Sequence, residues 1–169
     1  MDRQAGLLNL PPTLRGVALF LLSLGFVVSL AAEPLSSVVG PEAKLFARVN
    51  ELRRARHLEL LRADPALAKV ALEHANDMAR KAYLSHDNPA GQNPLDRVRA
   101  AGIDGFRLLA ENIASSDVSG DRISAIIEEW LRSPLHRENL LNPAFNTSGV
   151  ALVEAADGRT LVVQLYATF

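Results

Sequence analysis

Apolar positions divide this chain into one continuous apolar run and a longer segment with helical and strand periodicity. The run covers residues 16–32, carries no charge, and follows a flank with a net positive charge. A basic flank, an apolar run and small residues at its exit are typical of a secretory signal peptide, here cleaved after Ala31 or, as second choice, after Ala32. At 17 residues the run is also close to the length of a membrane span, so a retained anchor is the alternative. The predicted organisation is a signal peptide over 1–31, a linker over 32–40 and one domain over 41–169.

Helical periodicity occurs in four segments of the predicted domain, all before residue 135. Apolar residues recur every three or four positions, and the runs begin at capping residues or at prolines, which suit the first turn of a helix. Four helices are predicted: Pro41–Arg56; Pro65 to about Leu84, capped by Asp64; Pro94–Ala101, stopped by Gly102; and one that begins after Asp121 and ends at Ser133-Pro134. No element is predicted for residues 134–143.

The remaining apolar runs predict strands. The predicted strands are Phe106–Ser116, Ser148–Glu154 and Thr160–Thr168. The last two are rich in Val, Leu, Thr and Tyr, and Asp157-Gly158 between them is a strong hairpin signal. The first is a shorter apolar run that Glu111 and Asn112 interrupt. Helices that cover a small antiparallel sheet give an α+β layered domain.

Composition excludes several classes of functional site but says little about the fold. The chain has 169 residues, a formal net charge of −1, four histidines and no cysteine. Without cysteine there is no disulfide framework, no thiolate nucleophile and no Cys-ligated metal. Proteins that bind nucleic acid are usually basic, so the net charge of this chain argues against a nucleic-acid-binding protein. The standard signatures of zinc proteases, serine hydrolases and nucleotide-binding loops are missing.

Three polar residues beside apolar structure form the candidate site. His86 follows the second predicted helix, Glu111 interrupts an apolar run, and His136 follows the helix that contains Trp130. A buried carboxylate is costly unless it is paired or coordinated, and two imidazoles with one carboxylate can bind zinc with an open fourth position. From the residues alone, the alternative is a structural cluster in which Glu111 bonds to backbone and the histidines anchor loops.

Several segments occur in an order that characterises one family. They are VNELRRA, the block ALEHANDMARKAYLSHDNPAGQNPLDRV, then AENIA, EEWLRSPLHRENLLNP and the terminal SGVALVEAADGRTLVVQLYAT. This series resembles the CAP superfamily, also called SCP-like, of cysteine-rich secretory, antigen 5 and pathogenesis-related-one proteins, in its bacterial cysteine-free form. The resemblance covers about Leu45 to Thr168. It implies a three-layer α–β–α sandwich and a central cleft with two His and two Glu, which binds zinc in some members.

The resemblance places His86, Glu111 and His136 in that cleft as a predicted metal site. The second cleft glutamate would fall at Ser133, so one of the four groups is replaced and zinc binding is predicted to be weak. The predicted flanking residues are Asn112, Ser133, Arg137 and Asn139. The amide groups of the asparagines and the guanidinium of Arg137 can donate hydrogen bonds that hold the loops carrying the three site residues.

Other candidate residues are interpreted as structural. His74 is expected to pack beside the core stripe of the second helix, and Trp130 is expected in the core. The basic cluster around His57 is interpreted as a solvated face, and its arginines are Arg53, Arg54 and Arg56. Asn50 and Arg53 also resemble the N-x-x-R element of the family, which predicts that Arg53 anchors a loop.

Two functions follow from the resemblance. The first is a binding or interaction module that is secreted, periplasmic or in the cell envelope. Its expected partner is a small apolar ligand, an extracellular protein or a cell-wall component, with no nucleic acid and no membrane after signal cleavage. The alternative is a hydrolase, either metal-dependent in the same cleft or based on Ser133 activated by His136. We weigh binding above catalysis, because the fold does not by itself imply an activity.

Overall fold

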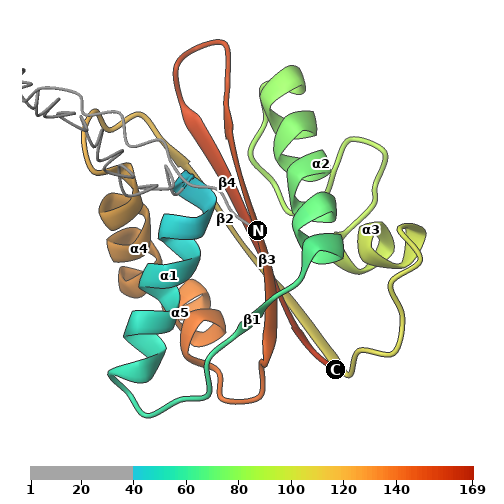
Figure 1. Ribbon diagram of the computed structural model, residues 1–169. Helices are drawn as coiled ribbons and strands as arrows, with labels where there is room; N and C mark the ends of the chain where they lie inside the picture. Colours follow the sequence, from blue (N-terminus) through green and yellow to red (C-terminus); the bar gives the residue numbers. More distant parts are fainter. Residues whose placement is uncertain (1–39) are drawn as a thin grey trace, which may run out of the picture. The chain divides into compact units, whose positions relative to one another are not determined.

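The computed structural model describes residues 40–169, so the predicted signal peptide and most of the predicted linker lie outside the described residues (Figure 1). The elements, in chain order, are α1 (Pro41–Arg54), β1 (Arg62–Ala63), α2 (Pro65–Lys81), α3 (Pro94–Ala100), β2 (Leu108–Ser116), α4 (Arg122–Arg132), α5 (Pro134–Leu141), β3 (Thr147–Glu154) and β4 (Thr160–Thr168). None of the helices within this range combines the length and the apolar character that a membrane span requires.

These elements form three layers around one sheet. The strand order is β1–β3–β4–β2, with β3 and β2 antiparallel to β4 and with β1 parallel to β3. Helices α1, α4 and α5 cover one face of the sheet, and α2 and α3 cover the other (Figure 1). The predicted α–β–α sandwich is therefore confirmed. The sheet is mixed rather than purely antiparallel, because β1 adds a short parallel strand at one edge.

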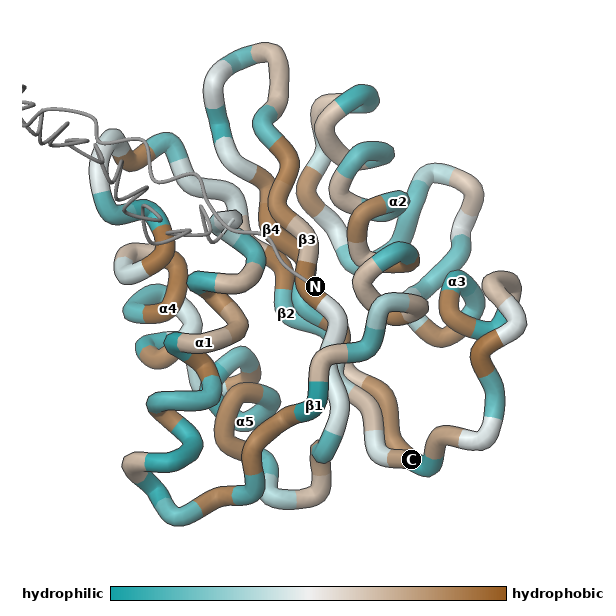
Figure 2. The backbone as a smooth tube through the Cα atoms, in the orientation of Figure 1, coloured by the Kyte–Doolittle hydropathy of each residue, from teal (hydrophilic) through white to brown (hydrophobic). Residues whose placement is uncertain are grey.

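Strand β4 joins the two hydrophobic cores, because side chains of a strand alternate between the faces of a sheet. All nine of its residues are buried. Val162 and Tyr166 pack in the core with α1, α4 and α5, whereas Leu161, Val163 and Leu165 pack in the core with α2 and α3. Figure 2 shows the corresponding concentration of apolar residues along β3 and β4. One strand thus supports both helical layers.

Two elements are absent from the sequence prediction, β1 and α5. We interpret Pro134 as the end of α4, but proline also suits the first turn of a new helix, and α5 begins there. Ser133, extended at ψ = 120°, is the joint between the two helices. Three boundaries shift by one or two residues: β2 begins at Leu108, β3 begins at Thr147 and α3 ends at Ala100.

Helix α1 also ends two residues earlier than predicted, at Arg54 rather than Arg56. The chain reverses there because His57 takes a left-handed conformation with φ = 58°. The amide of Leu58 then donates to the carbonyl oxygen of Arg53 at 3.0 Å. This bond satisfies a carbonyl of the last helical turn that would otherwise lack a partner.

Arg53 is buried, so its assignment to a solvated face is wrong, whereas its predicted role as a loop anchor is confirmed. The residue is 0% exposed, while Arg54, Arg56 and His57 are exposed as predicted. Its guanidinium donates hydrogen bonds of 2.9 and 3.0 Å to four carbonyl oxygens, those of Glu59, Leu140, Asn142 and Phe145. One side chain of α1 therefore holds both the loop before β1 and the turn between α5 and β3.

Helix α2 ends at Lys81, three residues before the predicted end, because Ala82 takes φ = 54° and ψ = 49°. A Cβ atom in this conformation costs roughly 1–2 kcal/mol, which glycine avoids. Ala82→Gly should therefore raise the free energy of unfolding by about 0.5–1 kcal/mol, after allowing for the backbone entropy of glycine. Chemical denaturation measures the change. Ala79→Gly, inside the regular helix, is the control and should lower stability by about 1 kcal/mol. A less stable Ala82→Gly protein would contradict the expectation.

Candidate functional site

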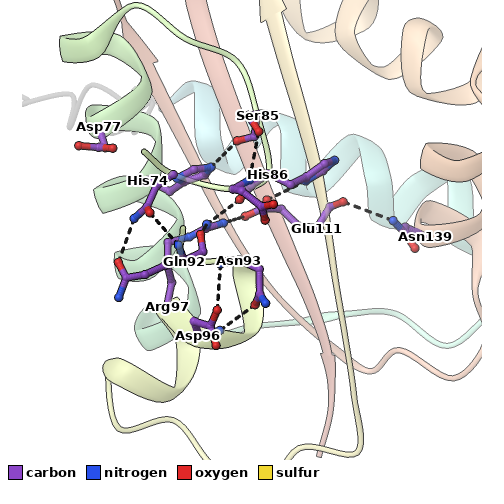
Figure 3. Close-up of polar contacts among 12 residues, drawn as sticks. His74, Asp77, Ser85, His86, Gln92, Asn93, Asp96, Arg97, Glu111 and Asn139 are labelled. Atoms are coloured by element: carbon purple, nitrogen blue, oxygen red, sulfur yellow. Dashed lines mark hydrogen bonds and ion pairs between the residues drawn. The ribbon is translucent and has the colours of Figure 1, made fainter. Parts of the chain in front are cut away.

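His86, Glu111 and Arg97 form a cluster of charged and polar side chains beside β2, the edge strand that carries Glu111 (Figure 3). His86 Nδ1 lies 2.8 Å from Glu111 Oε1, and Arg97 Nη2 donates to Glu111 Oε2 at 2.7 Å. The side chains of Glu111 and Arg97 are 1% and 9% exposed, whereas that of His86 is 46% exposed. Both carboxylate oxygens therefore have partners, and His86 presents the cluster to solvent.

Three segments that are distant in the sequence bring these groups together. Glu111 lies in the middle of β2, His86 in the loop after α2, and Arg97 in α3. A complete capping box positions α3, since the side chains of Asn93 and Asp96 each accept a hydrogen bond from the backbone of the other. The capping box fixes the first turn of α3, and this turn places the guanidinium of Arg97 beside the carboxylate of Glu111.

The loop that carries His86 is tied to the domain by His74 and Arg97. His74 Nε2 lies 2.9 Å from the carbonyl oxygen of Ser85, and Arg97 Nη1 donates to the carbonyl oxygens of His86 at 2.6 Å and Gln92 at 3.0 Å. His74 is 2% exposed, and its burial, followed by the charge of Arg97, lowers its pKa. The neutral ring therefore donates from Nε2, which confirms the structural role predicted for His74.

The Glu111 carboxylate fixes the orientation and the tautomer of His86. A carboxylate only accepts hydrogen bonds, so Nδ1 carries the proton and Nε2 is the ring nitrogen left to bind or react. Carboxylate–imidazole pairs of this kind occur where histidine binds a metal and where it acts as a general base. The geometry therefore makes His86 Nε2 the ligating or reactive atom of the cluster.

His136 stands near the cluster without sharing its hydrogen bonds. Its ring centre lies 6.4 Å from that of Trp130, which is fully buried as predicted. Within the described residues, His136 Nδ1 is buried and has no hydrogen-bond partner. Burial, followed by the nearby charge of His86, lowers the pKa of His136. The second imidazole is therefore neutral at pH 7 and lies within electrostatic reach of the first.

The four predicted flanking residues divide into two groups. Asn112 is fully buried, donates to the carbonyl oxygen of His136 at 3.0 Å, and accepts from Asn139 Nδ2 at 2.9 Å. These amides connect β2 to α5, a helix that the sequence does not predict. Ser133 makes no side-chain capping bond at the start of α5. Arg137 is exposed and borders a separate surface depression between α4 and α5. The two asparagines thus hold the site together.

The predicted zinc ligands are only partly available. In the part of the chain that the structure describes, no three His, Cys, Asp or Glu side chains are gathered as a metal-binding group. Arg97 and His86 engage both oxygens of Glu111, so this carboxylate orients a ligand rather than serving as one. The imidazoles of His86 and His136 remain as suitable donors. Zinc binding stays a prediction, with these two rings as the groups that would hold the ion.

A cavity of 490 Å³ lies next to the cluster, between α2 and α3. His74 and Arg97 form part of its wall, and charged residues of both signs, Lys69, Glu73 and Arg80, also line it. The two side chains that hold the His86 loop therefore also border a polar hollow on the α2 side.

Arg97 is the site residue that sequence reasoning misses. The available signal is that a carboxylate in an apolar run needs a partner. The sequence offers several arginines nearby, among them Arg99 and Arg107. Only the rotation of α3 about its axis selects Arg97, and that rotation depends on tertiary packing.

Comparison with known proteins decides the family. Residues 46–166 match the family model described as CAP, the cysteine-rich secretory protein family. The chain belongs to this family. His86, Glu111 and His136 all lie within the matched region, so the cluster described above is part of a CAP domain.

Bacterial relatives share this CAP domain. The uncharacterized protein YkwD of Bacillus subtilis is 33% identical over 120 residues, which are 71% of this chain and 45% of YkwD. The crystal structure of an extracellular SCP-domain protein of Bacillus anthracis matches with 33% identity and a TM-score of 0.64, over 75% of this chain and 39% of that one. An outer surface protein of Borrelia burgdorferi matches with 27% identity and a TM-score of 0.68, over 77% of this chain and 94% of that one. The chain spans less than half the length of the two Bacillus proteins.

Proposed function

We propose that this CAP domain is a secreted binding module that binds a ligand in the predicted cleft, through the two imidazoles of His86 and His136. The observation that carries the proposal is the buried carboxylate of Glu111, which holds His86 so that Nε2 is free on a half-exposed ring. Relatives described as extracellular or outer-surface proteins support export by the N-terminal apolar run. The proposed partner is a small apolar ligand, an extracellular protein or a cell-wall component.

Zinc is the probe that tests the cleft most directly. Neutral imidazoles are good zinc ligands, and a carboxylate on the second ring nitrogen is the usual support for such a histidine. A site with two protein ligands leaves the remaining positions to water. We therefore propose that zinc binds weakly, through His86 and His136.

Zinc affinity is expected to fall by at least about tenfold between pH 7 and pH 5, and to be lost in His136→Ala. An imidazole must be neutral to bind zinc, and ordinary histidine titrates near pH ~6.5, so protons compete with the metal as the pH falls. The lowered pKa of His136 moves its protonation toward the acid end of this interval. Isothermal titration calorimetry at both pH values, on wild type and variant, measures the change.

His57→Ala is the matched control for this experiment, because His57 is exposed in the turn after α1. It should bind zinc as the wild type does. His136 is only partly buried, so thermal unfolding should show that His136→Ala remains folded. An affinity that is independent of pH, or that persists in His136→Ala, would reject the two imidazoles as the zinc site. The cluster would then be a structural hydrogen-bond network.

One observation favours hydrolysis as a second candidate function. The Glu111–His86 contact has the form in which a carboxylate orients a general base. Ser133 with His136 is a weaker candidate pair, because His136 Nδ1 has no hydrogen-bond partner within the described residues. A hydrolase of this kind should cleave a fluorogenic ester or peptide and lose turnover in His86→Ala. Turnover lost in Ser133→Ala instead would favour the serine-based mechanism.

A further inference from the structure

We infer that Arg97 lowers the metal affinity of this site. Its guanidinium is hydrogen-bonded to the carboxylate of Glu111 and prevents a cation from binding to that carboxylate. The inference rests on the proposed function and deepens it: it gives the reason why the two imidazoles, and not a His–Glu set, would receive the ligand.

Charge balance inside the cluster is the first support for this role. Arg97 Nη2 lies 2.7 Å from Glu111 Oε2, so a positive and a negative charge cancel at short range. A divalent cation that approached Glu111 would be attracted by the carboxylate and repelled by the guanidinium at nearly the same distance. The pair therefore offers a cation little net attraction, whereas an unpaired carboxylate would offer a strong one.

The second support is that hydrogen bonds hold the Arg97 side chain in its position beside Glu111. Its Nη1 donates to the carbonyl oxygens of His86 and Gln92, so leaving Glu111 would break three hydrogen bonds. It would also leave a buried carboxylate with one partner fewer, and breaking a buried ion pair is strongly unfavourable. The capping box of Asn93 and Asp96 fixes the helix turn before it (Figure 3). A metal ion would have to displace this whole arrangement.

Burial of the carboxylate is the third support. The Glu111 side chain is only 1% exposed, so a hydrated ion has no open side from which to approach it. The exposed part of the cluster is the His86 ring, at 46%. With Arg97 in place, the site presents imidazole nitrogens and no free carboxylate. It therefore disfavours hard cations such as Ca²⁺ and Mg²⁺, which require oxygen ligands.

Replacing Arg97 with glutamine should tighten zinc binding at least tenfold relative to the wild type, measured by calorimetry at constant pH. Arg99→Gln is the matched control, since Arg99 is exposed on the same helix and its replacement removes the same charge. Arg97→Lys separates charge from loop anchoring: it keeps the positive charge, so its zinc affinity should stay near that of the wild type. The gain in Arg97→Gln should disappear when Glu111→Gln is added, because the released carboxylate is its source.

The outcomes distinguish this inference from the proposed function. If the wild type binds no zinc but Arg97→Gln does, zinc binding by the native cleft is rejected and the role of Arg97 stands. If Arg97→Gln binds zinc no more tightly than the wild type, whether or not the wild type binds it, the role of Arg97 is overturned. The same holds if Arg97→Lys and Arg97→Gln gain affinity equally, because loop release and not charge would then be the cause.

A measurement on the wild-type protein covers the case in which Arg97→Gln does not fold. During a zinc titration followed by NMR, the imidazole signals of His86 and His136 should respond, whereas the Arg97 guanidinium should keep the signals of a group that is hydrogen-bonded to Glu111, up to millimolar zinc. The Glu111 carboxyl signal is not used, because this carboxylate also contacts His86. Guanidinium signals that change to those of a free arginine would mean that zinc displaces Arg97, and would overturn the inference.

Discussion

Gly149→Ala is expected to destabilise the domain by at least about 3 kcal/mol, because α2 packs directly on the backbone of β3 at this position. A Cβ atom on Gly149 would overlap the backbone nitrogen of Ala68 and the backbone carbon of Leu67, and would lie 2.6 Å from Leu67 Cβ. These atoms belong to the first turn of a regular helix and cannot rotate away as a flexible side chain can. The helix as a whole would have to move off the sheet.

Urea denaturation of the purified domain measures this effect. Small domains are stable by about 5–15 kcal/mol, so the variant should unfold at a much lower urea concentration or fail to accumulate as a folded protein. Gly40→Ala is the control, because its Cβ would meet only the side-chain oxygen of Glu42, at 3.2 Å. A Gly149→Ala protein with wild-type stability would show that the α2–β3 packing is looser than described.

Arg53→Met is expected to cost about 3–5 kcal/mol, because it removes the donors of four carbonyl oxygens at once. Methionine fills a similar volume, so most of the loss is the cost of buried carbonyl groups without partners. Arg53→Lys should recover little, since a single ammonium group cannot reach carbonyls on both the loop before β1 and the turn after α5.

The adjacent Arg54→Met provides the comparison, because Arg54 is exposed in the last turn of the same helix. Its stability should lie within about 0.5 kcal/mol of the wild type. Hydrogen exchange should also show faster exchange around residues 58–61 and 140–145 in Arg53→Met, since the side chain anchors both segments. Equal effects of the two substitutions would mean that charge, and not hydrogen bonding, is responsible.

Local signals account for the elements that the sequence predicts well. Asp64 begins α2 because its side chain accepts from the amides of Ala66 and Leu67, and the hairpin turns at Gly158 with φ = 83°. Both signals act within a few residues. By contrast, β1 has two exposed residues and no periodicity, and it exists only because β3 offers a partner. In α5 only Leu140 is fully buried, so there is little apolar stripe to recognise.

The same distinction applies to the site. The order of motifs predicts His86, Glu111 and His136, and the two flanking asparagines, as site residues, because they belong to recognisable segments. The ion pair of Arg97 is not visible in this way, and the N-x-x-R element predicts that Arg53 anchors a loop but not that its side chain is fully buried. Each depends on how a helix is rotated against distant parts of the chain, and a basic residue on a helix is more often solvated.

Neither hydrophobic core of the domain can close before β4 is in place. This strand follows every other described element along the chain, yet it lies between β3 and β2 and contributes buried side chains to both cores. Its pairing with β2 joins Leu108 to Thr168, across α4, α5 and β3. Contacts between such distant residues slow folding, because a long loop must close before they form. We therefore expect the two helical layers to fold in one cooperative event that requires the C-terminal strand.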